Sequence, residues 1–113
     1  MIQTIDNVQV HNNINVMLSI LIFQEDHLFV AYCPSLDMSA YGESIQEAKN
    51  NFDEIVRLYV DECSQNGTLK EDLLQHGWVM SGLNSISIPE QIDMDIPAGL
   101  LKKQFNQNWT IPI

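Results

Sequence analysis

The chain has 113 residues and is 45% hydrophobic, which is enough for one modest core and argues against a second full domain. Fifteen acidic residues against five Lys and Arg give a formal net charge of −10 at pH 7. The basic residues are scattered, with one adjacent pair, so phosphate backbones would be repelled and nucleic acid is a poor partner. A basic protein is the more natural partner, although such acidity also serves simply to maintain solubility.

The N-terminal segment does not have the pattern of a secretory signal. It lacks a basic region, and polar side chains interrupt its apolar positions. No apolar run is long enough to predict a transmembrane helix. We therefore expect a cytoplasmic protein in which Cys33 and Cys63 are reduced thiols.

The first third of the chain predicts three strands. "INVMLSILIF", residues 14–23, has apolar side chains on both faces, which is typical of an interior strand covered on two sides. "LFVAYC" follows the short polar stretch "QEDH", so a hairpin is the simplest connection, and Pro34 ends the second strand. "MSAYG", residues 38–42, predicts a third short strand with Gly42 as a flexible exit.

Two helices are predicted next. Ser44 and Glu47 match a capping box, and apolar residues then recur at three- and four-residue steps until Asn66-Gly67, which ends the helix. The result is a long amphipathic helix that lies across the sheet. Thr68-Leu69-Lys70-Glu71 repeats the capping-box pattern and predicts a shorter helix that ends near Gly77. Trp78 is expected to pack this second helix against the sheet.

Beyond Trp78 the pattern weakens. Two short alternating segments, at residues 86–88 and 92–96, each end at a proline. Pro97 is placed to open a short helix through Leu100, Leu101 and Phe105, after which we expect an irregular end. The predicted organisation is an α+β domain over residues 1–80 and an extension over residues 81–113 that packs on the same domain or mediates oligomerisation.

A search for catalytic chemistry finds no motif. The three His and two Cys residues form no short-spaced ligand pair, and the chain has no glycine-rich phosphate loop and no nucleophile elbow. We therefore predict no catalytic residue, no metal and no cofactor. One alternative is a divergent metal-dependent nuclease that uses carboxylates before and at the start of the long helix, each of which also suits a turn or a helix N-terminus. These carboxylates are Asp26, Asp37, Glu43 and Glu47.

The stretch "FVAYCPSLDMSAYGESIQEAKNNFDEIVRLYV" resembles the HicB family of antitoxins. That family has a strand ending in a proline-containing turn, a third strand, a glycine, a small polar residue and Glu-Ala. The positions that match this pattern are Pro34, Leu36, Gly42, Ser44, Glu47 and Ala48. The resemblance covers residues 14 to about 60 and implies a partial ribonuclease-H-like fold, with the order β-β-β-α-β and no working acidic active site.

The resemblance also implies a partner. HicB proteins bind small basic HicA toxins, which are ribonucleases, and cover their catalytic histidine. The negative charge of this chain suits such a partner, because complementary potentials speed encounter and favour the correct pairing. We expect toxin contact at exposed acids of the long helix and of the turns. These candidates are Asp37, Glu43, Asp53, Glu54, Asp61 and Glu62.

Many HicB proteins also carry a C-terminal DNA-binding element. Residues 92–105 superficially resemble the strand and first helix of a ribbon-helix-helix, but Asp93 and Asp95 would face the DNA and repel phosphates, and a second helix is missing. Direct DNA binding is therefore not expected. A further alternative is an orphan interaction module without a toxin. We also expect a homodimer or higher oligomer, because one helical layer leaves apolar strand surface uncovered.

Overall fold

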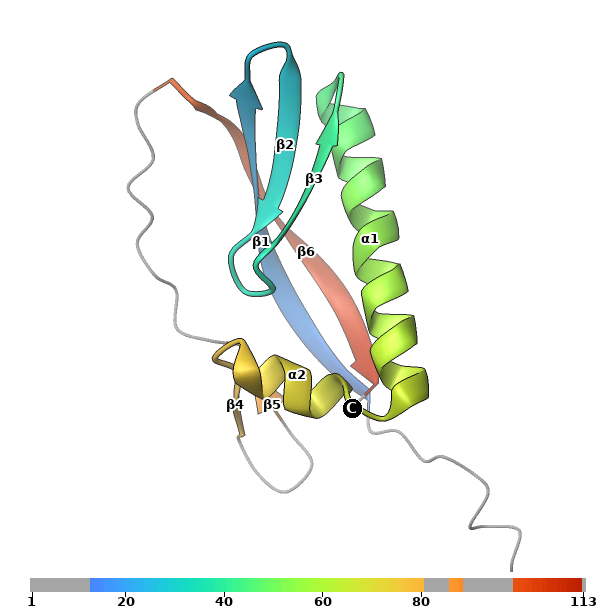
Figure 1. The fold of residues 1–113 in the computed structure, drawn as a ribbon. Coiled ribbons are helices and arrows are strands. Elements are labelled where there is room, and N and C mark those ends of the chain that lie inside the picture. The colour runs from blue at the N-terminus through green and yellow to red at the C-terminus, as the bar shows by residue number, and fades with distance from the viewer. Residues whose placement is uncertain (1–12, 81–85, 89–98, 113) are drawn as a thin grey trace, which may run out of the picture.

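The computed structural model describes residues 13–80, 86–88 and 99–112. The elements in chain order are β1 (Asn13–Glu25), β2 (Leu28–Cys33), β3 (Met38–Gly42), α1 (Ile45–Asn66), α2 (Leu69–Gln75), β4 (Val79–Met80), β5 (Ile86–Ser87) and β6 (Leu101–Pro112). Four strands form an antiparallel sheet in the order β3-β2-β1-β6, and β4 pairs with β5 in a separate small hairpin (Figure 1). The predicted α+β class, with one long and one short helix, is confirmed.

The first three strands form as the sequence predicts. Glu25 pairs with Leu28, so Asp26 and His27 make a two-residue turn in which Asp26 adopts a φ of 55°. Asp tolerates this left-handed conformation better than most residues. After β2, the Asp37 N–H donates to the Pro34 carbonyl, and this turn reverses the chain into β3.

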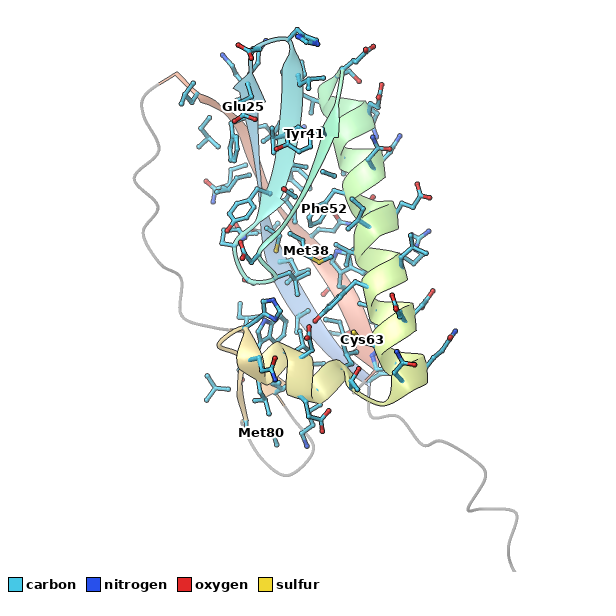
Figure 2. The ribbon with its side chains drawn as sticks, viewed as in Figure 1. Glu25, Met38, Tyr41, Phe52, Cys63 and Met80 are labelled. Atoms are coloured by element: carbon cyan, nitrogen blue, oxygen red, sulfur yellow. The ribbon has the colours of Figure 1, made fainter. Side chains whose placement is uncertain are left out.

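Both predicted ends of α1 are confirmed. Ser44 is extended, and its Oγ accepts from the Glu47 N–H at 3.0 Å. Gly67 has a φ of 69°, and its N–H donates to the carbonyls of Cys63 and Ser64. Because the helix is amphipathic, one face carries a buried apolar row. This row consists of Ala48, Phe52, Val56 and Val60. Figure 2 shows Phe52 between α1 and the sheet.

Gly42 has a different role from the one that the sequence predicts. Backbone flexibility does not explain why position 42 is a glycine, because Gly42 does not have a positive φ. A Cβ added at Gly42 would lie 2.3 Å from the Ala48 nitrogen and 2.8 Å from the Glu47 carbonyl carbon. Glycine is therefore required because the first turn of α1 touches the end of β3.

The sheet is covered by α1 on one face. The helix packs mainly over β3 and β2, as Figure 1 shows, and the alternate residues of β1 that point to it are buried. On the opposite face Leu21 is buried, whereas Met17 is 52% exposed. The prediction that β1 is an interior strand is confirmed, because it pairs with both β2 and β6. Cover on two sides holds only in part, because the described residues supply a helical layer to one face only.

The main difference from the sequence-based expectation is β6. Residues Leu101 and Phe105 were expected in a short helix followed by an irregular end, but Leu101–Pro112 is a strand paired with β1. The expected opening at Pro97 lies outside the described residues. Antiparallel pairing along β1 satisfies the backbone groups of β6, and this outweighs its weak local β preference.

The second helix is confirmed, but its predicted cap is not. Thr68 has φ −113° and ψ 2°, which is not the extended conformation of a cap residue, and its side chain makes no capping hydrogen bond. Its N–H instead donates to the Cys63 carbonyl at 2.9 Å. Trp78 is buried in the same core as Leu73 of α2 and the inward-facing residues of the sheet. Its Nε1 donates to the Ser35 carbonyl at 2.8 Å.

Candidate functional site

The solvent-exposed face of α1 carries a line of carboxylates. Residues seven apart lie on the same side of a helix, because seven residues make nearly two turns. Three exposed acids follow this spacing and a fourth is adjacent to the last of them, and we call the four the acidic stripe. They are Glu47, Glu54, Asp61 and Glu62. From the first to the last, the stripe extends for roughly 22 Å along the helix axis, at about 1.5 Å per residue.

Leu58 lies in the middle of the acidic stripe. It follows Glu54 by four residues and precedes Glu62 by four, and it is 61% exposed, the largest value among the exposed large apolar residues described. An apolar side chain surrounded by charged ones is an arrangement found at protein interfaces, where a central anchor is bordered by a polar rim. The stripe and Leu58 together have this composition, with an apolar centre and an acidic border.

The carboxylates of the stripe have no salt-bridge partner in the described part of the chain. There, the one contact within 4.0 Å between a basic and an acidic side chain joins His76 Nδ1, just after α2, to Asp72 Oδ2 on α2, at 3.6 Å. Lys49, which is on α1 itself, instead places its ammonium 4.8 Å from the ring centroid of Phe105. Arg57 is exposed on α1 between Glu54 and Asp61 but makes no ion pair within 4.0 Å, so among the described residues the stripe has no direct cationic partner.

The structure brings three of the six predicted contact residues into the stripe. Glu54, Asp61 and Glu62 belong to it, and Glu43 is exposed just before the Ser44 cap, at the end of the helix where the stripe begins. Glu47 was assigned only to capping or to a metal site by the sequence analysis. Leu58 was missed, although an apolar residue at a polar position of the helical pattern was a usable signal.

Asp53 and Asp37 lie apart from the stripe. The Asp53 Oδ1 accepts from Gln107 Nε2 at 3.2 Å, so this carboxylate is directed at β6. The Asp37 Oδ1 accepts from the Tyr32 hydroxyl at 2.9 Å. Tyr32 pairs with Ser39, on the face of the sheet opposite α1. Burial, helped by the hydrogen bond to Asp37, raises the pKa of Tyr32, which keeps the phenol protonated as a donor.

The remaining titratable groups of the described residues include one buried thiol and several carboxylates. Burial raises the pKa of the Cys33 thiol, which makes it a poor nucleophile at neutral pH. Within residues 13–80, 86–88 and 99–112, no group of three or more His, Cys, Asp and Glu could hold a metal ion. Of the carboxylates of the nuclease alternative, Asp26 and Asp37 lie at opposite ends of β2, in the β1–β2 turn and in the β2–β3 turn.

Tyr59 joins the two helices. Its hydroxyl donates to the Asp72 Oδ2, and burial together with this hydrogen bond raises the pKa of the phenol. The contact holds α2 against the C-terminal half of α1. Tyr59 is half-buried next to the buried Val60, and the residues of the acidic stripe remain exposed.

No family model, no curated protein and no solved structure matches this chain. Among the described residues, every helix is too short or too polar to cross a membrane.

Proposed function

We propose that the chain is a HicB-like antitoxin, or a binding protein derived from one, that neutralises a small basic HicA-type ribonuclease in the cytoplasm. The observation that carries the proposal is the acidic stripe with Leu58 at its centre. A chain of net charge −10 that gathers unpaired carboxylates on one exposed helix face attracts a cationic surface. Inhibition then follows when the bound antitoxin covers the catalytic residue of the toxin.

The stripe and Leu58 contribute to binding in different ways. Exposed carboxylates raise the association rate and orient the partner, but each contributes only about 0.2–1 kcal/mol because water and salt screen it. Leu58 supplies apolar area that leaves water on binding. We therefore expect the acids to set the salt dependence and Leu58 to slow dissociation.

The residues of the HicB-like pattern have structural roles that support the fold part of the proposal. Gly42 allows α1 to touch β3, Ser44 caps α1, and Leu36 is buried after the Pro34 turn. The order β1-β2-β3-α1, followed by β6 in the same sheet, is compatible with a partial ribonuclease-H-like fold in which α2 and the β4–β5 hairpin are additions.

The test compares two variants of equal charge. The stripe variant E54Q/D61N/E62Q and the control variant E25Q/D26N/E71Q each remove three negative charges, and all six residues are exposed. A tagged wild-type chain first captures its partner from the native host, and mass spectrometry identifies the partner. Affinity for that purified protein is then measured by calorimetry.

The proposal predicts capture of a small basic ribonuclease. The stripe variant should bind it about tenfold more weakly, since three screened pairs amount to about 1.4 kcal/mol, while the control variant binds within about twofold of wild type. L58N should weaken binding similarly without changing the net charge. Capture of no basic protein would instead favour the orphan module, and equal weakening of both charge variants would remove the stripe from the interface.

A further inference from the structure

The two edges of the sheet differ in length and charge. The β3 edge has five residues, Met38–Gly42, and Asp37 and Glu43 flank its ends. The β6 edge has twelve residues, carries Lys102 and Lys103, and contains no acid and no proline before Pro112. Short strands, proline and charged side chains, lysine above all, are the devices that keep edges from pairing. The β3 edge is short and has acids at both ends, whereas on the β6 edge the lysines stand at the start and Pro112 at the end, so residues 104–111 carry no such protection.

From this difference we propose that β6 is a dimer seam, at which it pairs antiparallel with β6 of a second copy and joins two four-stranded sheets into one. The charge of β6 disfavours a basic occupant, and the order of its side chains fits a second copy. A basic partner such as the proposed toxin would meet Lys102 and Lys103, whereas a second copy of this acidic chain approaches along a segment that is free of carboxylates. The seam and the acidic stripe are thus separate surfaces, and the seam does not depend on the proposed function.

The sequence of β6 is self-complementary in the antiparallel direction. A two-fold axis at Gln107 places Phe105 opposite Trp109 of the second copy, and Trp109 opposite its Phe105. Both rings are only half-buried, because α1 makes few contacts with β6. Aromatic pairs across strands stabilise a sheet by roughly 0.2–1 kcal/mol each. The strand therefore offers two such pairs to a symmetric partner.

The remaining positions fit the same register. On the other face Gln104 lies opposite Thr110 and Asn106 opposite Asn108, so neutral side chains that hydrogen-bond meet each other. Lys103 lies opposite Ile111, so the lysines of the two copies stay at opposite ends of the seam. A parallel pairing would instead place lysine next to lysine.

Gln107 supplies a further reason for the position of the axis. Its Nε2 donates to Asp53, but its Oε1 is buried and has no hydrogen-bond partner among the described residues, and the same holds for the Nε1 of Trp109. Buried polar atoms that lack a partner are uncommon and costly. At the proposed axis the two Gln107 amides lie side by side, where each has a donor for the other's oxygen after a small rotation.

The test uses the full chain in sedimentation equilibrium, with Asn106→Lys as the seam variant and Ser39→Lys as the matched control. Both residues are exposed strand positions on the same face of the sheet, one at each edge, and both changes add one positive charge. We expect wild type and S39K to dimerise with dissociation constants within about threefold of each other, and N106K to weaken dimerisation at least tenfold, because it places two lysines near the axis. Circular dichroism confirms that each variant is folded.

Hydrogen exchange gives a second readout without substitution. The β6 amides of wild type should exchange more slowly as the protein concentration rises through the dissociation constant, whereas the β3 amides should not change. A monomer at all concentrations would overturn the proposal. So would a dimer that N106K leaves intact and whose β6 amides exchange at a rate independent of concentration, because the copies would then meet at another face.

Discussion

The contact between Gly42 and α1 gives the sharpest stability prediction. In Gly42→Ala the new methyl carbon would lie 2.3 Å from the Ala48 nitrogen, whereas ordinary contacts begin near 3.4 Å. The helix start must therefore move by about 1 Å, because the opposing atoms are backbone and have no rotamer to change. Overpacking of this kind costs typically 1–3 kcal/mol, and we expect the upper end, about 3 kcal/mol or roughly a 12 °C fall in Tm.

Urea denaturation followed by far-UV circular dichroism measures this loss, and Gly67→Ala is the matched control. At Gly67 no atom lies within 4 Å of an added Cβ, so the expected cost comes only from its φ of +69° and is about 1–2 kcal/mol. A G42A protein within about 0.5 kcal/mol of wild type, or no less stable than G67A, would refute the close approach of α1 to β3.

Two further predictions concern the ends and the junction of the helices. Ser44→Ala should cost about 1 kcal/mol because the Ser44 Oγ caps α1, whereas Thr68→Ala should cost less than about 0.5 kcal/mol because Thr68 does not cap α2. Equal losses in urea denaturation would contradict this difference. Tyr59 has a pKa raised above its usual value of 10.0, so the folded state favours the neutral phenol. The stability from Tyr59 is therefore complete below about pH 10 and decreases as pH rises toward the folded pKa. Tyr59→Phe should remove that part of the decrease between pH 9.5 and 11, which denaturation curves at several pH values can measure, and an unchanged pH slope would contradict the raised pKa of Tyr59.

The sequence predicted the elements whose local signals agree with their packing. The long helix has a cap at Ser44, a continuous apolar row and a left-handed end at Gly67, and each of these is visible in the residues alone. The hairpin was predictable because two strongly apolar runs flank a short polar turn. At these places local preference and tertiary structure indicate the same conformation.

The sequence-based predictions failed where tertiary contacts, and not local sequence, determine the conformation. Along β6 the row that faces α1 is broken by Gln107 among Phe105, Trp109 and Ile111, so the alternation is weak, and pairing with β1 determines the strand. Thr68 matches a capping box in sequence, but its backbone N–H donates to the Cys63 carbonyl near the end of α1. The role of Gly42 depends on an inter-element distance that no local pattern contains.

The candidate site was predicted in part for the same reason. Exposed acids of α1 follow from the helical period, so Glu54, Asp61 and Glu62 were found. Asp53 was included because the period alone does not show that β6 lies beside it and that Gln107 donates to it. The helical period thus predicted three of the exposed acids, but it missed Leu58 and did not show that Asp53 faces β6.

Inhibition of the captured ribonuclease tests the central claim most directly. Cleavage of a fluorescent RNA by the purified HicA-type partner is followed while the wild-type chain, the E54Q/D61N/E62Q variant or the E25Q/D26N/E71Q variant is added. With the ribonuclease at or below the dissociation constant of the complex, we predict that wild type and the control reach half inhibition at similar concentrations, and that the stripe variant requires about tenfold more. Undiminished cleavage with excess wild-type chain would contradict the antitoxin proposal, and equal inhibition by all three proteins would contradict the role of the acidic stripe.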